Sequence, residues 1–115
     1  MRKNLTKKSV QTFKRLKELK VYQLRHANQF IIHANGCVCF QSYDSLIAIY
    51  DYETQTLLLG RDFDYSITTL RHLYMFINDY CSYEIASIIN NANNSKQALL
   101  KAIKQGVILY DYEMK

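Results

Sequence analysis

The chain has 115 residues, 49% hydrophobic and 22% charged, so it is long enough for one folded domain and its composition argues against disorder. The net charge of +5 is uneven: residues 1–20 hold eight Lys or Arg and one Glu, a net +7, and the rest carries −2. No apolar run approaches the roughly 20 residues of a membrane helix, and the basic start lacks the apolar core of a signal peptide, so we expect a single cytoplasmic domain over residues 1–115 without membrane contact.

Residues 5–20 are expected to form a basic helix, because apolar residues are interleaved there with Lys and Arg and show no strand-like alternation. Such a basic arm can neutralise the phosphates of DNA or RNA, dock on an acidic protein surface, or simply be solvated. Its candidate binding residues are Arg2, Lys3, Lys7, Lys8, Lys14, Arg15, Lys17 and Lys20. For residues 21–27, continuation of the helix and the start of a strand remain open.

A β-meander is expected next. Two β-prone runs, 30–34 and 37–43, are separated by Asn35-Gly36, which favours a two-residue type I′ hairpin. A second apolar pair, 46–51 and 56–60, surrounds a short polar turn. Short connections predict about four antiparallel strands with one face to cover.

A helix that covers this sheet is predicted after Asp64. Ser66 is placed to cap its first turn near Thr69, and Tyr65 and Leu70 occupy the two positions of a hydrophobic staple. Apolar residues then recur at helical spacing, at Leu70, Leu73, Tyr74 and Ile77, and the helix is expected to end near Tyr80.

The C-terminal region, residues 81–115, is expected to be helical. It contains a short helix over 83–89, an asparagine-rich break, and a helix capped by Ser95 that runs to Lys104 and stops at Gly106. The apolar run 107–110 is either a strand at the sheet edge or a buried tail. The fold class is therefore α+β, with a basic arm (1–20), a meander with its capped helix (28–80), and the helical region.

A metal site is not expected, although His33, Cys37 and Cys39 are residue types that bind zinc. The predicted hairpin register places His33 on the opposite face from both cysteines. The three cysteines are an odd number, which argues against a disulfide framework and favours reduced thiols.

Catalysis is not expected either. Cys81 and His72 are nine residues apart on or near one helix, too far for a Cys–His pair. Asp44, Asp62 and Asp64 could form a carboxylate cluster for a metal, but acids before a helix N-terminus are favoured by the helix dipole alone. No phosphate-binding glycine loop or hydrolase motif is present. We therefore expect no catalytic residue and no cofactor.

Two stretches, 41–51 (Gln-Ser-Tyr-Asp-Ser-Leu-Ile-Ala-Ile-Tyr-Asp) and 63–73 (Phe-Asp-Tyr-Ser-Ile-Thr-Thr-Leu-Arg-His-Leu), resemble a family of small uncharacterised proteins from phages and mobile elements of Gram-positive bacteria. The resemblance covers roughly residues 30–80 and implies a strand meander followed by a capped helix. It implies no established activity.

Small phage proteins without catalytic motifs often act by stoichiometric binding, and anti-CRISPR proteins block host nucleases in this way. By this analogy we expect a non-enzymatic protein that binds and inhibits or redirects a host protein, for example a Cas nuclease or its complex. The alternative is an accessory or regulatory protein that binds DNA or RNA through the basic arm.

Overall fold

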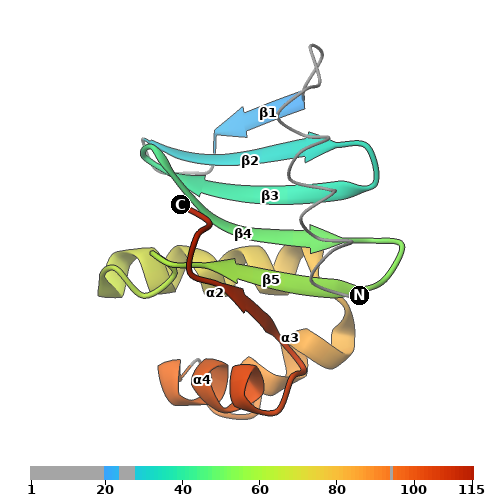
Figure 1. Ribbon diagram of the computed structural model, residues 1–115, viewed down its shortest axis with the longest axis vertical. Coiled ribbons are helices and arrows are strands. Elements are labelled where there is room, and N and C mark those ends of the chain that lie inside the picture. Colours follow the sequence, from blue (N-terminus) through green and yellow to red (C-terminus); the bar gives the residue numbers. More distant parts are fainter. Residues whose placement is uncertain (1–19, 24–27, 94) are drawn as a thin grey trace.

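The computed structural model describes residues 20–23, 28–93 and 95–115, which form one sheet and three helices (Figure 1). The strands are β1 (Lys20–Gln23), β2 (Gln29–Ala34), β3 (Cys37–Ser42), β4 (Ser45–Asp51), β5 (Thr56–Gly60) and β6 (Leu109–Asp111). The helices are α2 (Ile67–Tyr80), α3 (Tyr83–Asn90) and α4 (Lys96–Lys104). The predicted α+β class is confirmed.

The six strands lie side by side in chain order, and all neighbours are antiparallel except β5 and β6, which are parallel. The predicted four-stranded meander corresponds to β2–β5, extended by β1 on one side and β6 on the other. For the run 107–110 the sequence left an edge strand and a buried tail as alternatives. Its last two residues belong to the edge strand β6.

The predicted basic helix lies outside the described residues, apart from its last position. Lys20 is the first residue of β1 and pairs with His33 of β2, so the prediction of a helix through Lys20 is wrong at that end. Residues 21–27, for which the sequence left helix and strand as alternatives, begin as a strand. Val21 and Tyr22 are both β-prone and pair with Ile32 and Ile31.

The β2–β3 hairpin follows the predicted register. Asn35 and Gly36 both have positive φ angles, +30° and +83°, as a type I′ turn requires. Ala34 consequently faces Cys37, and His33 faces Val38. The ring of His33 contacts Tyr80 of α2, whereas Cys37 and Cys39 belong to an apolar cluster on the other face, so the predicted separation is confirmed.

Both faces of the sheet are apolar, which corrects the expectation of a single face to cover. Helix α2 packs on β3 and β4, where Phe40 stacks on Phe76 at 5.9 Å between ring centroids. Cys39, Ile49 and Leu58 form a second buried cluster on the opposite face. The sequence of β5, Thr-Leu-Leu-Leu-Gly, indicates burial on both faces, because its apolar residues do not alternate with polar ones. All five residues are buried, as in strands covered on both sides.

Helix α2 begins where the sequence predicts. Ser66 Oγ accepts a hydrogen bond from the backbone N–H of Thr69 at 3.0 Å, and Leu73 and Ile77 are fully buried. The predicted staple is wrong, because Tyr65 is 80% exposed and buries little against Leu70. Helices α3 and α4 lie past the β6 edge of the sheet, at the bottom of the view in Figure 1. Ser95 caps α4 as predicted, and Ser82, which was not singled out in the sequence, caps α3.

Candidate functional site

An open cleft of about 860 Å³ lies where the ends of β2–β4 meet the start of α2. One wall comes from the strands and their turn: Gln29, Ser42, Tyr43, Asp44, Ser45 and Ile47. The other comes from the loop before α2 and its first turns: Asp62, Tyr65, Ser66, Thr68, Thr69, Arg71 and His72. This volume suits a side chain or small molecule bound in a surface cleft.

The tight turn between β3 and β4 places Tyr43 at the rim. Ser42 pairs with Ser45, which leaves only Tyr43 and Asp44 to reverse the chain. The backbone of Tyr43 has φ +52°, and its N–H donates to the carbonyl of Asn28 at 2.7 Å. A register shift between Phe40 and Gln41 precedes this turn, and such bulges re-aim the residues that follow them.

A hydrogen bond ties the two walls together. Ser45 Oγ at the start of β4 donates to Asp62 Oδ2 at 3.0 Å, across 17 residues of sequence. On the helix side, the hydroxyls of Ser66 and Thr69 lie 3.0 Å apart, in addition to the cap. These contacts give the cleft a defined shape.

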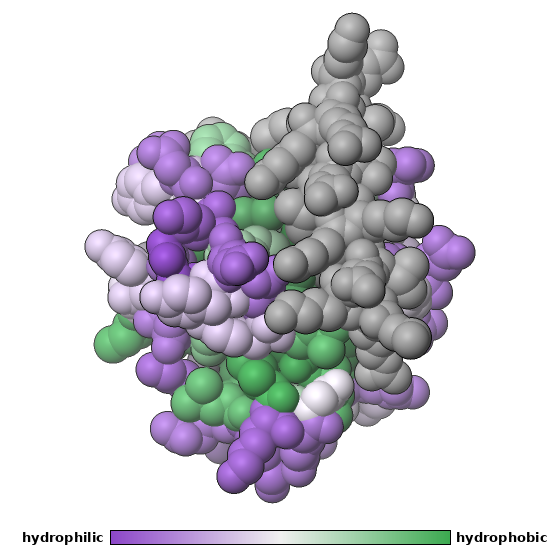
Figure 2. Space-filling view, viewed as in Figure 1, coloured by the Kyte–Doolittle hydropathy of each residue, from purple (hydrophilic) through white to green (hydrophobic). Residues whose placement is uncertain are grey.

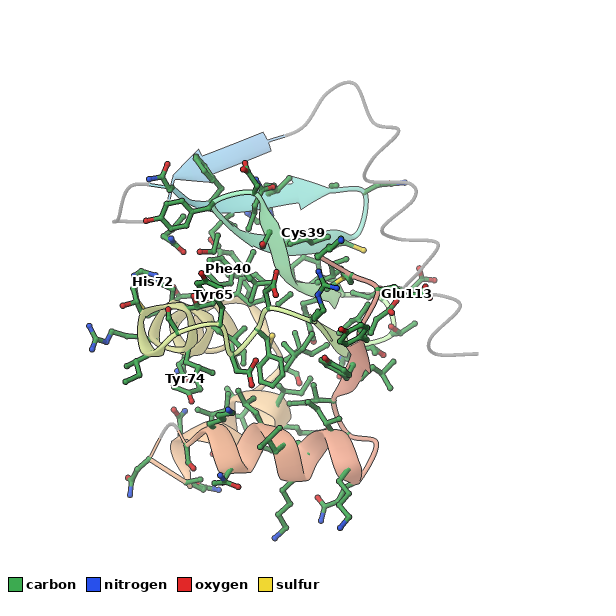
Figure 3. The ribbon with its side chains drawn as sticks, turned by 60° about the vertical axis from the view of Figure 1, so that its left-hand side comes forward. Cys39, Phe40, Tyr65, His72, Tyr74 and Glu113 are labelled. Carbon is green, nitrogen blue, oxygen red and sulfur yellow. The ribbon has the colours of Figure 1, made fainter. Side chains whose placement is uncertain are left out.

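Two buried polar side chains line the inner part of the cleft. Gln29 and His72 are each only 3% exposed. Gln29 Oε1 is buried and accepts no hydrogen bond from any residue that the structure describes. Figure 3 shows His72 and Tyr65 on the same side of the molecule, at the beginning of α2. A buried acceptor without a donor is costly, and it marks a place where a ligand can supply one.

The outer part of the cleft is charged and aromatic. Tyr43 and Tyr65 are 64% and 80% exposed, and the exposed side chains of Asp44 and Arg71 line the cleft beside them. In Figure 2, hydrophilic residues gather on the left side of the molecule, where α2 begins. Asp64 does not line this cleft; it forms an ion pair with Lys96 at 3.1 Å.

The cysteines do not line the cleft, and burial makes Cys39 and Cys81 poor nucleophiles. Burial, with a smaller contribution from Cys37, raises the pKa of Cys39 from 9.0 to about 12. Burial also raises the pKa of Cys81, which caps the far end of α2 from the cleft. Within residues 20–23, 28–93 and 95–115, no group of three potential metal ligands comes together.

The structure brings together only some of the residues singled out by sequence. Tyr65, Ser66 and Thr69, predicted as structural, line the cleft, and Leu70 packs against the core. The basic residues from Arg2 to Lys17 lie outside the described part of the chain, and Lys20 lies in β1. Sequence reasoning missed Gln29, Tyr43 and Arg71. The sequence did contain an indication of the cleft, because most of its lining residues lie in the two stretches that carry the family resemblance, 41–51 and 63–73.

The structure is that of a small α+β protein with a polar cleft that has Tyr43 and Tyr65 at its rim. No helix in the described residues is both long and apolar enough to cross a membrane. The chain belongs to a family of unknown function (DUF8033), whose model matches residues 9–98. No curated protein and no solved structure matches it.

Proposed function

We propose that this protein acts by stoichiometric binding of another protein, without catalysis, and that the tyrosine-rimmed cleft is the contact surface. The observation that carries the proposal is the exposure of Tyr43 and Tyr65 on opposite walls of one cleft. Tyrosine is enriched in protein interfaces because its ring offers large contact area and its hydroxyl a hydrogen bond. Ile67, next to this rim at the start of α2, is 78% exposed and adds apolar area.

The backbone of Tyr43 supports the same proposal. A bulky residue at φ +52° occupies a left-handed conformation that costs about 1–2 kcal/mol and that glycine would adopt freely. Its ring is 64% exposed and contributes little to the core. An exposed, strained tyrosine at a cleft rim is better explained by contact with a partner than by folding.

The partner we propose is a host protein. The resemblance of residues 41–51 and 63–73 to proteins of phages and mobile elements supports this choice, and a Cas nuclease of a CRISPR system, or its complex, is the specific candidate by analogy with anti-CRISPR proteins. Binding would inhibit or redirect that protein.

The test is affinity capture from lysates of Gram-positive bacteria that carry CRISPR systems, followed by reconstitution with the purified captured protein. Wild-type protein is compared with Tyr43→Gly, Tyr65→Ala and a control, Tyr83→Ala. Tyr83 is 87% exposed but lies at the start of α3, beyond the far end of α2. We expect a one-to-one complex that is retained by the control and weakened at least tenfold by either rim variant, as for interface hot spots.

Two results would count against the proposal. Capture that is equal for all four proteins would show that the cleft is not the contact surface. Capture that disappears after nuclease treatment would favour the alternative function, in which Arg2, Lys3, Lys7, Lys8, Lys14, Arg15, Lys17 and Lys20 bind DNA or RNA.

A further inference from the structure

We infer that the cleft receives a basic side chain of the partner, an arginine in the first instance; this inference rests on the proposed function. The cleft presents hydrogen-bond acceptors at its inner and outer ends and aromatic rings at its rim. A guanidinium group supplies five N–H donors and a planar face for stacking.

The buried acceptor is the first argument. Gln29 is 3% exposed, it lines the cleft, and its Oε1 atom has no donor among the described residues. An N–H or O–H group of a ligand can supply the missing hydrogen bond, whereas a phosphate or carboxylate oxygen cannot donate one to Oε1. The inner end of the cleft therefore favours a ligand that carries donors.

The carboxylates are the second argument. Asp44 is exposed and Asp62 is half-buried, and both line the cleft. Asp62 already accepts a hydrogen bond from Ser45, so it is held in place before a ligand arrives. Arg61 Nε lies 3.9 Å from Asp62 Oδ1 and offsets part of the charge of that carboxylate. The exposed carboxylate of Asp44 is therefore the group that attracts a cation to this cleft.

The rim is the third argument. Tyr43 and Tyr65 expose their rings at the mouth of the cleft, where a cation can lie over an aromatic face. The chain uses the same contact elsewhere: the guanidinium carbon of Arg61 lies 5.1 Å from the centroid of the Tyr112 ring. Arginine is favoured over lysine because its planar group both stacks and donates several hydrogen bonds.

The test uses the whole, isotope-labelled protein and short peptides. Acetyl-Gly-Arg-Gly-amide is titrated while the side-chain amide signal of Gln29 is followed by NMR, assigned by its loss in Gln29→Met. The same peptide with citrulline in place of arginine is the uncharged control, and adenosine monophosphate is the anionic probe. We expect the arginine peptide to shift the Gln29 signal and the citrulline peptide to bind about tenfold more weakly, as for loss of a charge-assisted contact.

Charge variants separate a cation site from an anion site by the sign of their effects. Asp44→Asn should weaken binding of the arginine peptide several-fold, and Arg71→Gln should strengthen it, because both side chains are exposed and neither change disturbs the core. Absence of a Gln29 shift with the arginine peptide would overturn the inference. A shift with adenosine monophosphate that Arg71→Gln abolishes would overturn it as well.

These outcomes remain distinct from those of the proposed function. If the arginine peptide fails to bind while capture of a protein still depends on Tyr43 and Tyr65, the inference is wrong and the proposed function stands. If capture is indifferent to both tyrosines, the proposed function fails whatever the peptide does.

Discussion

Ser45 and Asp62 hold the two walls of the cleft together through a hydrogen bond of 3.0 Å between Ser45 Oγ and Asp62 Oδ2. Ser45 is the first residue of β4, and Asp62 lies in the loop that leads to α2. The bond thus couples the turn that carries Tyr43 to the segment that carries Tyr65. The geometry of the proposed contact surface depends on this link.

Removal of this link gives the first prediction. Ser45→Ala should lower the free energy of unfolding by about 1–2 kcal/mol, because a hydrogen bond to a charged group is lost and the carboxylate is left partly buried. Guanidinium denaturation measures the change. Ser45→Thr, which retains a hydroxyl, is the control, and an unchanged stability in Ser45→Ala would show that the walls are held by other contacts.

The cap of α2 gives the second prediction. Ser66→Ala should cost about 1 kcal/mol of stability, whereas Ser66→Asn should cost only a few tenths, because asparagine also caps well. Thermal and chemical denaturation of both variants provide the measurement. Equal losses in the two variants would contradict a capping role for Ser66.

Close packing around Gly60 gives the third prediction. A Cβ atom on Gly60 would lie 2.6 Å from the carbonyl oxygen of Leu46 and 2.8 Å from that of Met114, both of them backbone atoms. Gly60→Ala should therefore lower the free energy of unfolding by about 1–3 kcal/mol. Gly106→Ala is a useful comparison, because its site is open and only its φ of +77° is unfavourable for alanine. A smaller loss for Gly60→Ala than for Gly106→Ala would contradict the packing at β5.

The buried thiol of Cys39 gives the fourth prediction. Its pKa is 9.0 when unperturbed and about 12 in the folded protein, so the folded state keeps a proton that the unfolded chain releases. The contribution of this group to stability is complete below pH 9.0 and is lost as the pH rises from there toward 12. Cys39→Ala should flatten the pH dependence of the unfolding free energy in that window by about 1.4 kcal/mol per pH unit. Denaturation curves on both sides of pH 9.0 test this, and equal slopes would contradict it.

Local chemistry made much of the fold predictable. The positive φ angles at Asn35 and Gly36 follow from residue types that tolerate them, and the hairpin register follows from the turn. The start of α2 likewise follows from one serine hydroxyl within reach of the Thr69 amide. These features depend on residues close together in the sequence.

The cleft could not be predicted in this way. It combines Gln29, the turn at Tyr43, and the start of α2, which come together only when the sheet has formed and the helix has packed on it. Tyr65 illustrates the difficulty, because its position before a helix cap predicts a buried staple, yet its ring is 80% exposed. The same residue type serves folding or binding according to contacts made far away in sequence.

The most direct test of the central claim is site-specific photo-crosslinking in host-cell lysate, with a benzophenone amino acid placed at position 65 or at position 83. Both native side chains are tyrosines that are at least 80% exposed, so either replacement should leave the fold intact. We predict a single covalent adduct with one host protein from position 65 and none from position 83. An adduct from position 83 alone, or no protein adduct from position 65, would contradict the claim that the cleft binds a protein partner.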